Sequence, residues 1–174
     1  MRPQSHAVKF YDDASFLVDS VVPFLRTSLL SNGTAIAVLT PKHRQALEAE
    51  FGSRFLGTQG RLTFMDGRDT LARFMVDGEP NEEAFLSVFE PLLREAAQVG
   101  PISVFGEMVA LLWEDRHWQA AVRLEELWNR LAEKCPFSLL CAYPLSGFSR
   151  DQHTDSFLDI CGAHSRIILT TALA

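Results

Sequence analysis

The segment from Ile102 to Asn129 places polar side chains within a largely apolar sequence. A short apolar run ends at Phe105, just before Glu107, and a later helical pattern carries Glu125 and Asn129. Burying a polar side chain without a partner is costly, so these residues need either hydrogen-bond partners or a ligand. Glu125 and Asn129 are four residues apart and therefore share one side of the predicted helix. We favour a ligand contact for Glu107 and a structural hydrogen-bond network for Glu125.

Cysteine and histidine side chains raise the question of a metal site. Cys161 and His164 are three residues apart in a predicted helix, Cys141 lies in a predicted strand, and His6 lies near the start of the chain. Structural zinc sites usually have paired ligands such as two C-x-x-C motifs, whereas this sequence has one C-x-x-H with apolar neighbours. Buried cysteine often behaves as a small apolar side chain. The sequence therefore argues against a metal.

The segment from Thr40 to Arg44 raises the question of a nucleotide, because it follows an apolar strand and begins a helix with three basic side chains. Helix N-termini attract anions. A Walker A loop, however, requires G-x-x-x-x-G-K-[ST], and the sequence contains no Gly-Lys pair. A G-x-S-x-G nucleophile motif is also absent. We expect neither a nucleotide cofactor nor an enzyme, and a degenerate anion site stays open as an alternative.

Periodic patterns predict the elements that position these residues. Strands are predicted at 6–11, 34–39, 61–65, 102–105, 137–142 and 166–170. Helices are predicted at about 13–31, 41–51, 69–75, 81–96, 108–113, 118–133 and 151–163. Pro23 and Pro91 fall inside two helical patterns, where they should divide or bend the helix. The alternation predicts one α/β domain over residues 1–174, with three layers and a mostly parallel, doubly wound sheet.

Ligands of open parallel sheets collect outside the carboxyl ends of the strands. This rule selects the polar residues at the predicted strand ends, which are Tyr11, Thr40, His43, Asp66, Glu107, Cys141 and Tyr143. An ordinary loop or capping role is the alternative for each of them.

Composition narrows the function classes. The net charge is −6 and only three lysines are present, which argues against a nucleic-acid surface. No apolar run approaches the roughly 20 residues needed to span a membrane. Three cysteines without a secretory signal are typical of a cytoplasmic protein.

Several segments together resemble the MEDS family, the methanogen/methylotroph sensory domain of bacterial and archaeal signalling proteins. The matching segments, between His6 and about Leu169, are HAVKFYDDASFL, TPKHRQAL, FMDGRDTLARFMVDGEPN, FGEMVALLW, LEELWNRLA, FSLLCAYPL and ICGAHS. The resemblance implies a RecA/KaiC-like fold with a degenerate P-loop. It also implies a domain that senses small organic molecules, such as simple hydrocarbon derivatives, and that acts with a histidine kinase, an ATPase or a transcription regulator. The pocket positions that it implies are His6, Tyr11, Glu107, Glu125, Asn129, Cys141, Tyr143, Cys161 and His164.

The leading hypothesis is a cytoplasmic sensory domain that binds a small molecule and relays the signal to a partner, or to an output domain outside these 174 residues. The candidate ligand-binding residues are His6, Tyr11, Thr40, His43, Arg44, Asp66, Glu107, Glu125, Asn129, Cys141, Tyr143, Cys161 and His164. One rival is a protein-interaction module with a vestigial pocket, in which Trp113 or Trp118 would mark an exposed docking surface. Another is a degenerate nucleotide binder that uses Thr40 to Arg44.

Overall fold

The computed structural model describes residues 5–54, 59–147 and 154–168. Within these residues, six strands form one parallel sheet in the order β3-β2-β6-β7-β1-β8. The strands are β1 (His6–Tyr11), β2 (Thr34–Leu39), β3 (Arg61–Asp66), β6 (Ile102–Gly106), β7 (Ser138–Pro144) and β8 (Arg166–Ile168). The predicted α/β class and parallel sheet are thereby confirmed, and the architecture is consistent with a Rossmann- or RecA-like fold.

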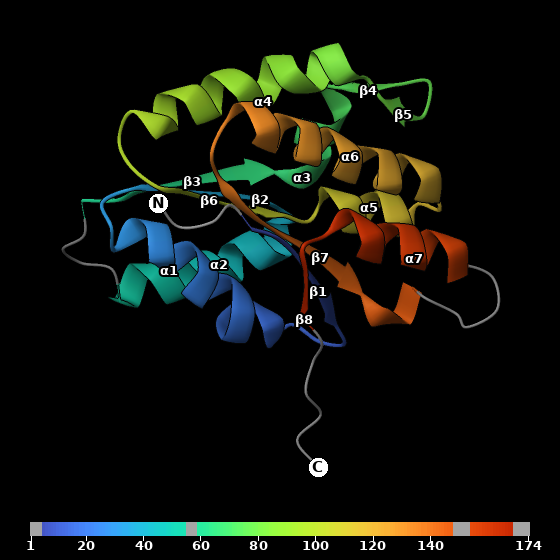
Figure 1. The fold of residues 1–174 in the computed structure, drawn as a ribbon. Coiled ribbons are helices and arrows are strands. Elements are labelled where there is room, and N and C mark those ends of the chain that lie inside the picture. Colours follow the sequence, from blue (N-terminus) through green and yellow to red (C-terminus); the bar gives the residue numbers. More distant parts are fainter. Residues whose placement is uncertain (1–4, 55–58, 148–153, 169–174) are drawn as a thin grey trace.

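Helices cover both faces of the sheet, which gives three layers (Figure 1). On one face lie η1, a π-helix (Leu17–Val21), α1 (Val22–Leu29) and α2 (Pro41–Arg54). On the other face lie α4 (Glu82–Ala97), α5 (Met108–Glu114), α6 (Trp118–Lys134) and α7 (Thr154–Ala163). The shorter α3 (Gly67–Ala72) follows β3. Among these described helices, none combines the length and the apolar character needed to cross a membrane.

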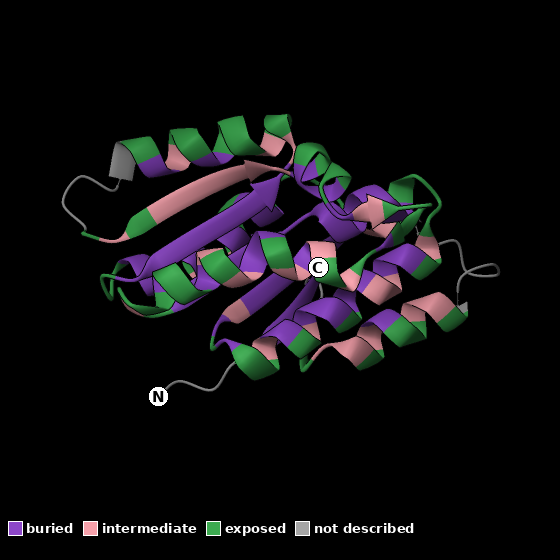
Figure 2. Ribbon diagram, turned by 90° about the horizontal axis from the view of Figure 1, so that it is seen from above, coloured by how far each residue is buried: buried purple, intermediate pink, exposed green. Residues whose placement is uncertain are grey.

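The central strands are buried because both of their faces are covered, as the purple strands in Figure 2 show. Side chains alternate along β7, so Leu139, Cys141 and Tyr143 face α5, α6 and α7. Leu140 and Ala142 face the α1 and α2 layer instead. This period-two alternation explains how β7 can deliver polar groups to one layer while its other face stays apolar.

Proline and capping residues set several helix boundaries. Pro23 lies in the first turn of α1 and separates it from η1, as predicted. Helix α4 begins at its predicted cap, Asn81, and continues through Pro91 as a single element. The predicted end of α2 at Gly52 is wrong, because the helix continues to Arg54.

The segment after β3 differs most from the prediction. Asp66 caps α3 by accepting a hydrogen bond from the Asp69 amide, and the helix ends at Ala72, so both ends of the helix predicted at 69–75 are wrong. Between the helices predicted at 69–75 and 81–96, the chain forms a small antiparallel hairpin that was not predicted, β4 (Met75–Val76) and β5 (Glu79–Pro80). The predicted helix start at Asp151 and strand end at Thr170 lie outside the described residues.

An aromatic cluster fixes α6 in place over the sheet. Trp128 of α6 packs against Phe85 and Phe89 of α4, with ring centroids 5.0 and 4.5 Å away. Phe74 contacts the same two phenylalanines and is fully buried. Aromatic pairs at these separations contribute about 0.5–1.5 kcal/mol beyond the apolar area that they bury. The position of α6, and of any polar group it carries, therefore depends on these rings.

We predict that Phe89→Ala lowers the free energy of unfolding by about 3–5 kcal/mol, because the cavity it leaves cannot close between α4 and α6. Chemical denaturation measures the effect. Leu30→Ala is the control, since Leu30 is 62% exposed and its loss should change stability by less than about 0.5 kcal/mol. Equal effects of the two substitutions would contradict the packing described above.

Candidate functional site

The structure sorts most of the predicted site residues into two groups on opposite faces of the sheet. The first, which we call the Glu125 cluster, contains His6, Glu125, Cys141, Tyr143 and His164, with Asn129 beside it. The second, which we call the Glu107 group, contains Thr40, His43 and Glu107, with the ring of Tyr11 beside it.

Glu125 is the centre of the first group and is fully buried, with 0% of its surface exposed. Helix α6 turns the carboxylate toward the sheet because Leu124, Glu125 and Trp128 lie on its buried side. Tyr143 Oη donates to Glu125 Oε1 over 2.8 Å, and His164 Nε2 lies 3.3 Å from the same oxygen. Cys141 Sγ donates to Glu125 Oε2 over 3.2 Å, and His6 Nε2 lies 3.1 Å from the same Oε2 atom. Both carboxylate oxygens thus face two polar groups each.

The two histidine rings are held by their other ring nitrogens. His6 Nδ1 lies 2.8 Å from Asn129 Oδ1, and Asn129 Nδ2 donates to the Ala163 carbonyl over 2.9 Å. His164 Nδ1 lies 2.6 Å from the Ile160 carbonyl. Because both partners are oxygen acceptors, each Nδ1 carries a proton and each Nε2 is directed toward Glu125. The rings themselves are in contact, with centroids 4.1 Å apart.

The protonation of these groups is strongly coupled. Burial alone would raise the pKa of the Glu125 carboxyl, but the histidines His164 and His6 hold that pKa well below its usual range. Burial would lower the pKa of His164, yet Glu125 raises it above its usual value. Burial, together with the Glu125 charge, also raises the pKa values of Cys141 and Tyr143. The Glu125 carboxylate and the His164 ring therefore stabilise each other's charged forms.

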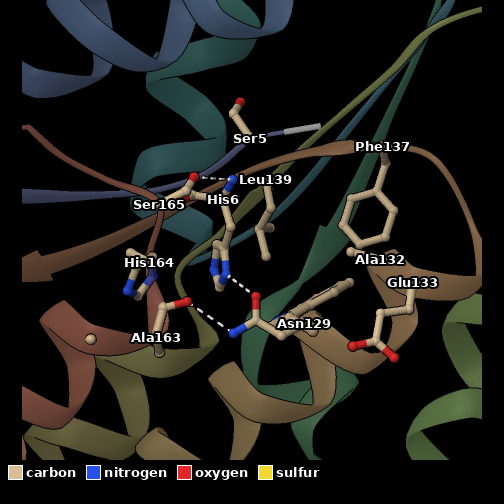
Figure 3. A pocket seen from close by; sticks show the side chains of 12 residues that line it. Ser5, His6, Asn129, Ala132, Glu133, Phe137, Leu139, Ala163, His164 and Ser165 are labelled. Carbon is tan, nitrogen blue, oxygen red and sulfur yellow. Dashed lines mark hydrogen bonds between the residues drawn. The ribbon is translucent and has the colours of Figure 1, made fainter. Parts of the chain in front are cut away.

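A pocket of about 480 Å³ opens beside this cluster (Figure 3). We call it the amino-edge pocket, because its lining includes the first residues of β1 and β7 and the Ser165 that precedes β8. Its lining residues are Ser5, His6, Trp128, Asn129, Ala132, Glu133, Phe137, Leu139, Gly162, Ala163, His164 and Ser165. The pocket therefore lies at the amino ends of these strands, whereas the sequence predicted a ligand at their carboxyl ends.

The Glu107 group lies at the carboxyl ends of β2 and β6. Glu107 is 1% exposed and accepts hydrogen bonds from the Thr40 backbone amide over 2.9 Å and from Thr40 Oγ1 over 3.4 Å. The other carboxylate oxygen of Glu107, Oε1, pairs with His43 Nδ1. Because Thr40 immediately precedes α2, the carboxylate occupies the position where a helix N-terminus would attract an external anion. This contact gives Glu107 a structural role and lends no support to phosphate binding by Thr40 to Arg44.

Tyr11 lies at the carboxyl end of β1, beside the Glu107 group. Burial, followed by the Glu107 charge, raises the pKa of its hydroxyl well above the usual value. The pocket beside it measures only about 80 Å³ and is lined partly by Asp12, Asp13 and Asp19. Such a small acidic pocket is a poor fit for an anion or for a drug-sized molecule.

The other predicted site residues have separate surroundings. Arg44 is exposed, pairs with Glu48 and lies over the Phe64 ring. Asp66 is the cap of α3, and Cys161 is partly buried on α7. The interaction hypothesis placed Trp113 or Trp118 on an exposed surface. That expectation is wrong for Trp113, which is 2% exposed and belongs to the core, whereas Trp118 is partly exposed.

Sequence reasoning missed the backbone partners of the site and much of the pocket wall. The Ile160 and Ala163 carbonyls orient the two histidines, and no residue type signals such a role. Ser165 accepts from the His6 amide over 3.1 Å and donates to the His6 carbonyl over 2.9 Å. Its position directly after His164 was the available signal.

A parallel sheet covered by helices on both faces defines the class of three-layer α/β domains. The family model that matches the chain, over residues 5–164, is MEDS, the methanogen/methylotroph, DcmR sensory domain. The chain belongs to this family, as the sequence motifs predicted, and is therefore a sensory domain. Comparison with curated proteins and with solved structures gave no match.

We predict that Glu107→Ala lowers the free energy of unfolding by about 3 kcal/mol, because it leaves the half-buried Thr40 amide and His43 ring without their acceptor. Denaturant titration measures the loss. Glu114→Ala is the matched control on the exposed end of the following helix, and it should have little effect. A loss no larger than that of Glu114→Ala would show that the buried contact contributes nothing.

Proposed function

We propose that this sensory domain binds a small organic molecule in the amino-edge pocket and relays binding to a signalling partner. The observation that carries the proposal is the position of the pocket directly against the Glu125 cluster. Two residues of that cluster, His6 and His164, line the pocket, and Asn129 joins them. A volume of about 480 Å³ lies within the range of about 300–1,000 Å³ that is typical of small-molecule sites.

The chemistry of the lining supports a ligand with an apolar body and a polar group. Trp128, Ala132, Phe137 and Leu139 supply apolar wall. Asn129 and the two histidines supply polar atoms at one end, and these atoms are positioned by fixed partners. Few, well-oriented polar groups in an apolar wall give orientation and specificity to small ligands. Simple hydrocarbon derivatives that carry an oxygen or nitrogen fit this description.

The elements around the pocket suggest how binding reaches a partner. The pocket is bounded by α6, by the end of α7 and by Ser165, which precedes the edge strand β8. A ligand held between α6 and α7 would favour one position of α7 over others, which is how binding shifts a conformational equilibrium. Leu158 on α7 and Ile167 on β8 are 59% and 45% exposed, so both elements offer apolar surface to a partner. We propose a cytoplasmic kinase or transcription regulator as that partner.

A thermal-shift screen of alcohols, amines, carboxylic acids and other simple hydrocarbon derivatives tests the proposal. A ligand present at 100 times its Kd stabilises the folded state by about 2.7 kcal/mol and raises Tm accordingly. We expect Ala132→Phe to abolish that shift by filling the pocket.

The matched control is Gln119→Phe, which places the same side chain in a different pocket on the same helix and should leave the shift intact. A screen without a stabilising compound, or a shift that survives Ala132→Phe, would overturn the proposal.

A further inference from the structure

Four side chains of the Glu125 cluster bring metal-binding atoms together. One donor atom each from His6, Glu125, Cys141 and His164 can be chosen so that all lie within 4.8 Å of one another, and no other such group of His, Cys, Asp and Glu occurs in the described part of the chain. Imidazole nitrogen, thiolate sulfur and carboxylate oxygen are the donors that zinc takes in proteins. The four come from β1, α6, β7 and the residue after α7, so no local motif reveals them.

The orientation of the histidines leaves a place for a cation. Each Nδ1 is committed to an oxygen acceptor, Asn129 Oδ1 for His6 and the Ile160 carbonyl for His164. In a neutral imidazole with its proton on Nδ1, the Nε2 atom carries a lone pair. The Nε2 lone pairs of His6 and His164 would then face the lone pairs of the Glu125 carboxylate oxygens. Such an arrangement is repulsive unless a proton or a metal ion lies between the atoms. The same Nδ1 contacts to amide and backbone oxygen are what orients histidine ligands at metal sites.

An unpartnered buried atom supports the metal rather than the proton. The His164 side chain has 0% exposure, and its Nε2 makes no hydrogen bond of acceptable geometry although Glu125 Oε1 lies 3.3 Å away. A protonated Nε2 would be expected to align with that oxygen, because charge-assisted hydrogen bonds are short and strong. His164 Nε2 is therefore a buried atom that lies close to an acceptor without being aligned with it, and a bound cation would supply the partner that it lacks.

The spacing of the donors suits a tetrahedral ion. Zinc lies about 2.0–2.3 Å from nitrogen, oxygen and sulfur ligands, which sets neighbouring ligand atoms roughly 3.3–3.8 Å apart. His6 Nε2 lies 3.6 Å from Cys141 Sγ and 3.1 Å from Glu125 Oε2. Cys141 Sγ lies 3.2 Å from that oxygen. These three separations are within about half an ångström of the tetrahedral values, and all four donor atoms lie within 4.8 Å of one another.

The charges of the four ligands also favour a divalent metal ion. A divalent ion with one carboxylate, one thiolate and two neutral imidazoles forms a site with no net charge. Neutral sites are tolerated in an apolar interior, whereas an uncompensated charge is costly. Tyr143 Oη donates to Glu125 Oε1 and would stay as an outer partner of the carboxylate ligand.

We propose that His6, Glu125, Cys141 and His164 bind a divalent transition metal of the zinc class, at a site beside the amino-edge pocket, which His6 and His164 line. Binding displaces the Cys141 thiol proton to solvent, and the thiolate forms the metal–sulfur bond. The inference rests on the four donors and does not depend on which molecule the pocket binds.

The test uses metal ions alone on protein purified without a metal-chelating column and stripped with a chelator. Co²⁺ is the probe, because a bound thiolate gives it a near-ultraviolet charge-transfer band, and equilibrium dialysis with elemental analysis gives the stoichiometry for Zn²⁺. We expect one metal per chain. The double variant Cys135→Ser/Cys161→Ser keeps Cys141 as the single cysteine and leaves the cluster intact, so it should retain the band.

Substitutions at the cluster complete the test. His164→Ala should weaken metal binding 10-fold or more, and Asn129→Ala, which keeps all four ligands but frees the His6 ring, should weaken it about 10- to 100-fold. His117→Ala, at an exposed histidine, is the control and should bind metal as the wild type does. Circular dichroism checks that each variant is folded. Less than about one-tenth of an equivalent of metal in the wild type, or equal binding by folded His164→Ala, would overturn the proposal.

Discussion

The buried negative charge of Glu125 is the constraint on which this part of the molecule depends. A carboxylate with no exposed surface is costly to place in a protein interior unless its oxygens are fully engaged. The chain meets this demand with four groups from three places in the fold, and each of the two histidines among them is held by a further partner. Tyr143 and Cys141 approach from β7, His6 from β1, and His164 from the end of α7. The charge thereby ties α6 and α7 to the middle of the sheet.

The aromatic packing and the polar cluster of α6 support each other. Trp128 lies three positions after Glu125, so both project from the buried side of the helix. The rings of Phe85 and Phe89 fix the height and rotation of α6 through Trp128. Without that constraint the carboxylate would not be held at hydrogen-bond distance from β7. Rigid elements that carry the polar groups are what gives a binding site its precision.

Much of the fold was predictable because its signals are local. Apolar runs of strand length gave the six strands, and Pro23 and Asn81 set helix boundaries as their chemistry requires. The hairpin β4–β5 was missed because it has only two residues per strand and depends on the positive φ angles of Asp77 and Gly78. The members of the Glu125 cluster were also named from the sequence. Their mutual contact was not, because it follows from the strand order, which places β1 between β7 and β8. The spacing of cysteine and histidine along the sequence could not predict that His6, Glu125, Cys141 and His164 lie together, because the strand order brings them together.

The hydrogen bonds between His6 and Ser165 join residues that are 159 positions apart in the chain. Contacts of such large sequence separation carry a large loop-closure entropy, which the other contacts of the fold must offset. The amino-edge pocket takes its lining from both ends of the described chain, from Ser5 and His6 to His164 and Ser165. A molecule that occupies it therefore stabilises the association of the start of the chain with its end, and not the ordering of a single loop.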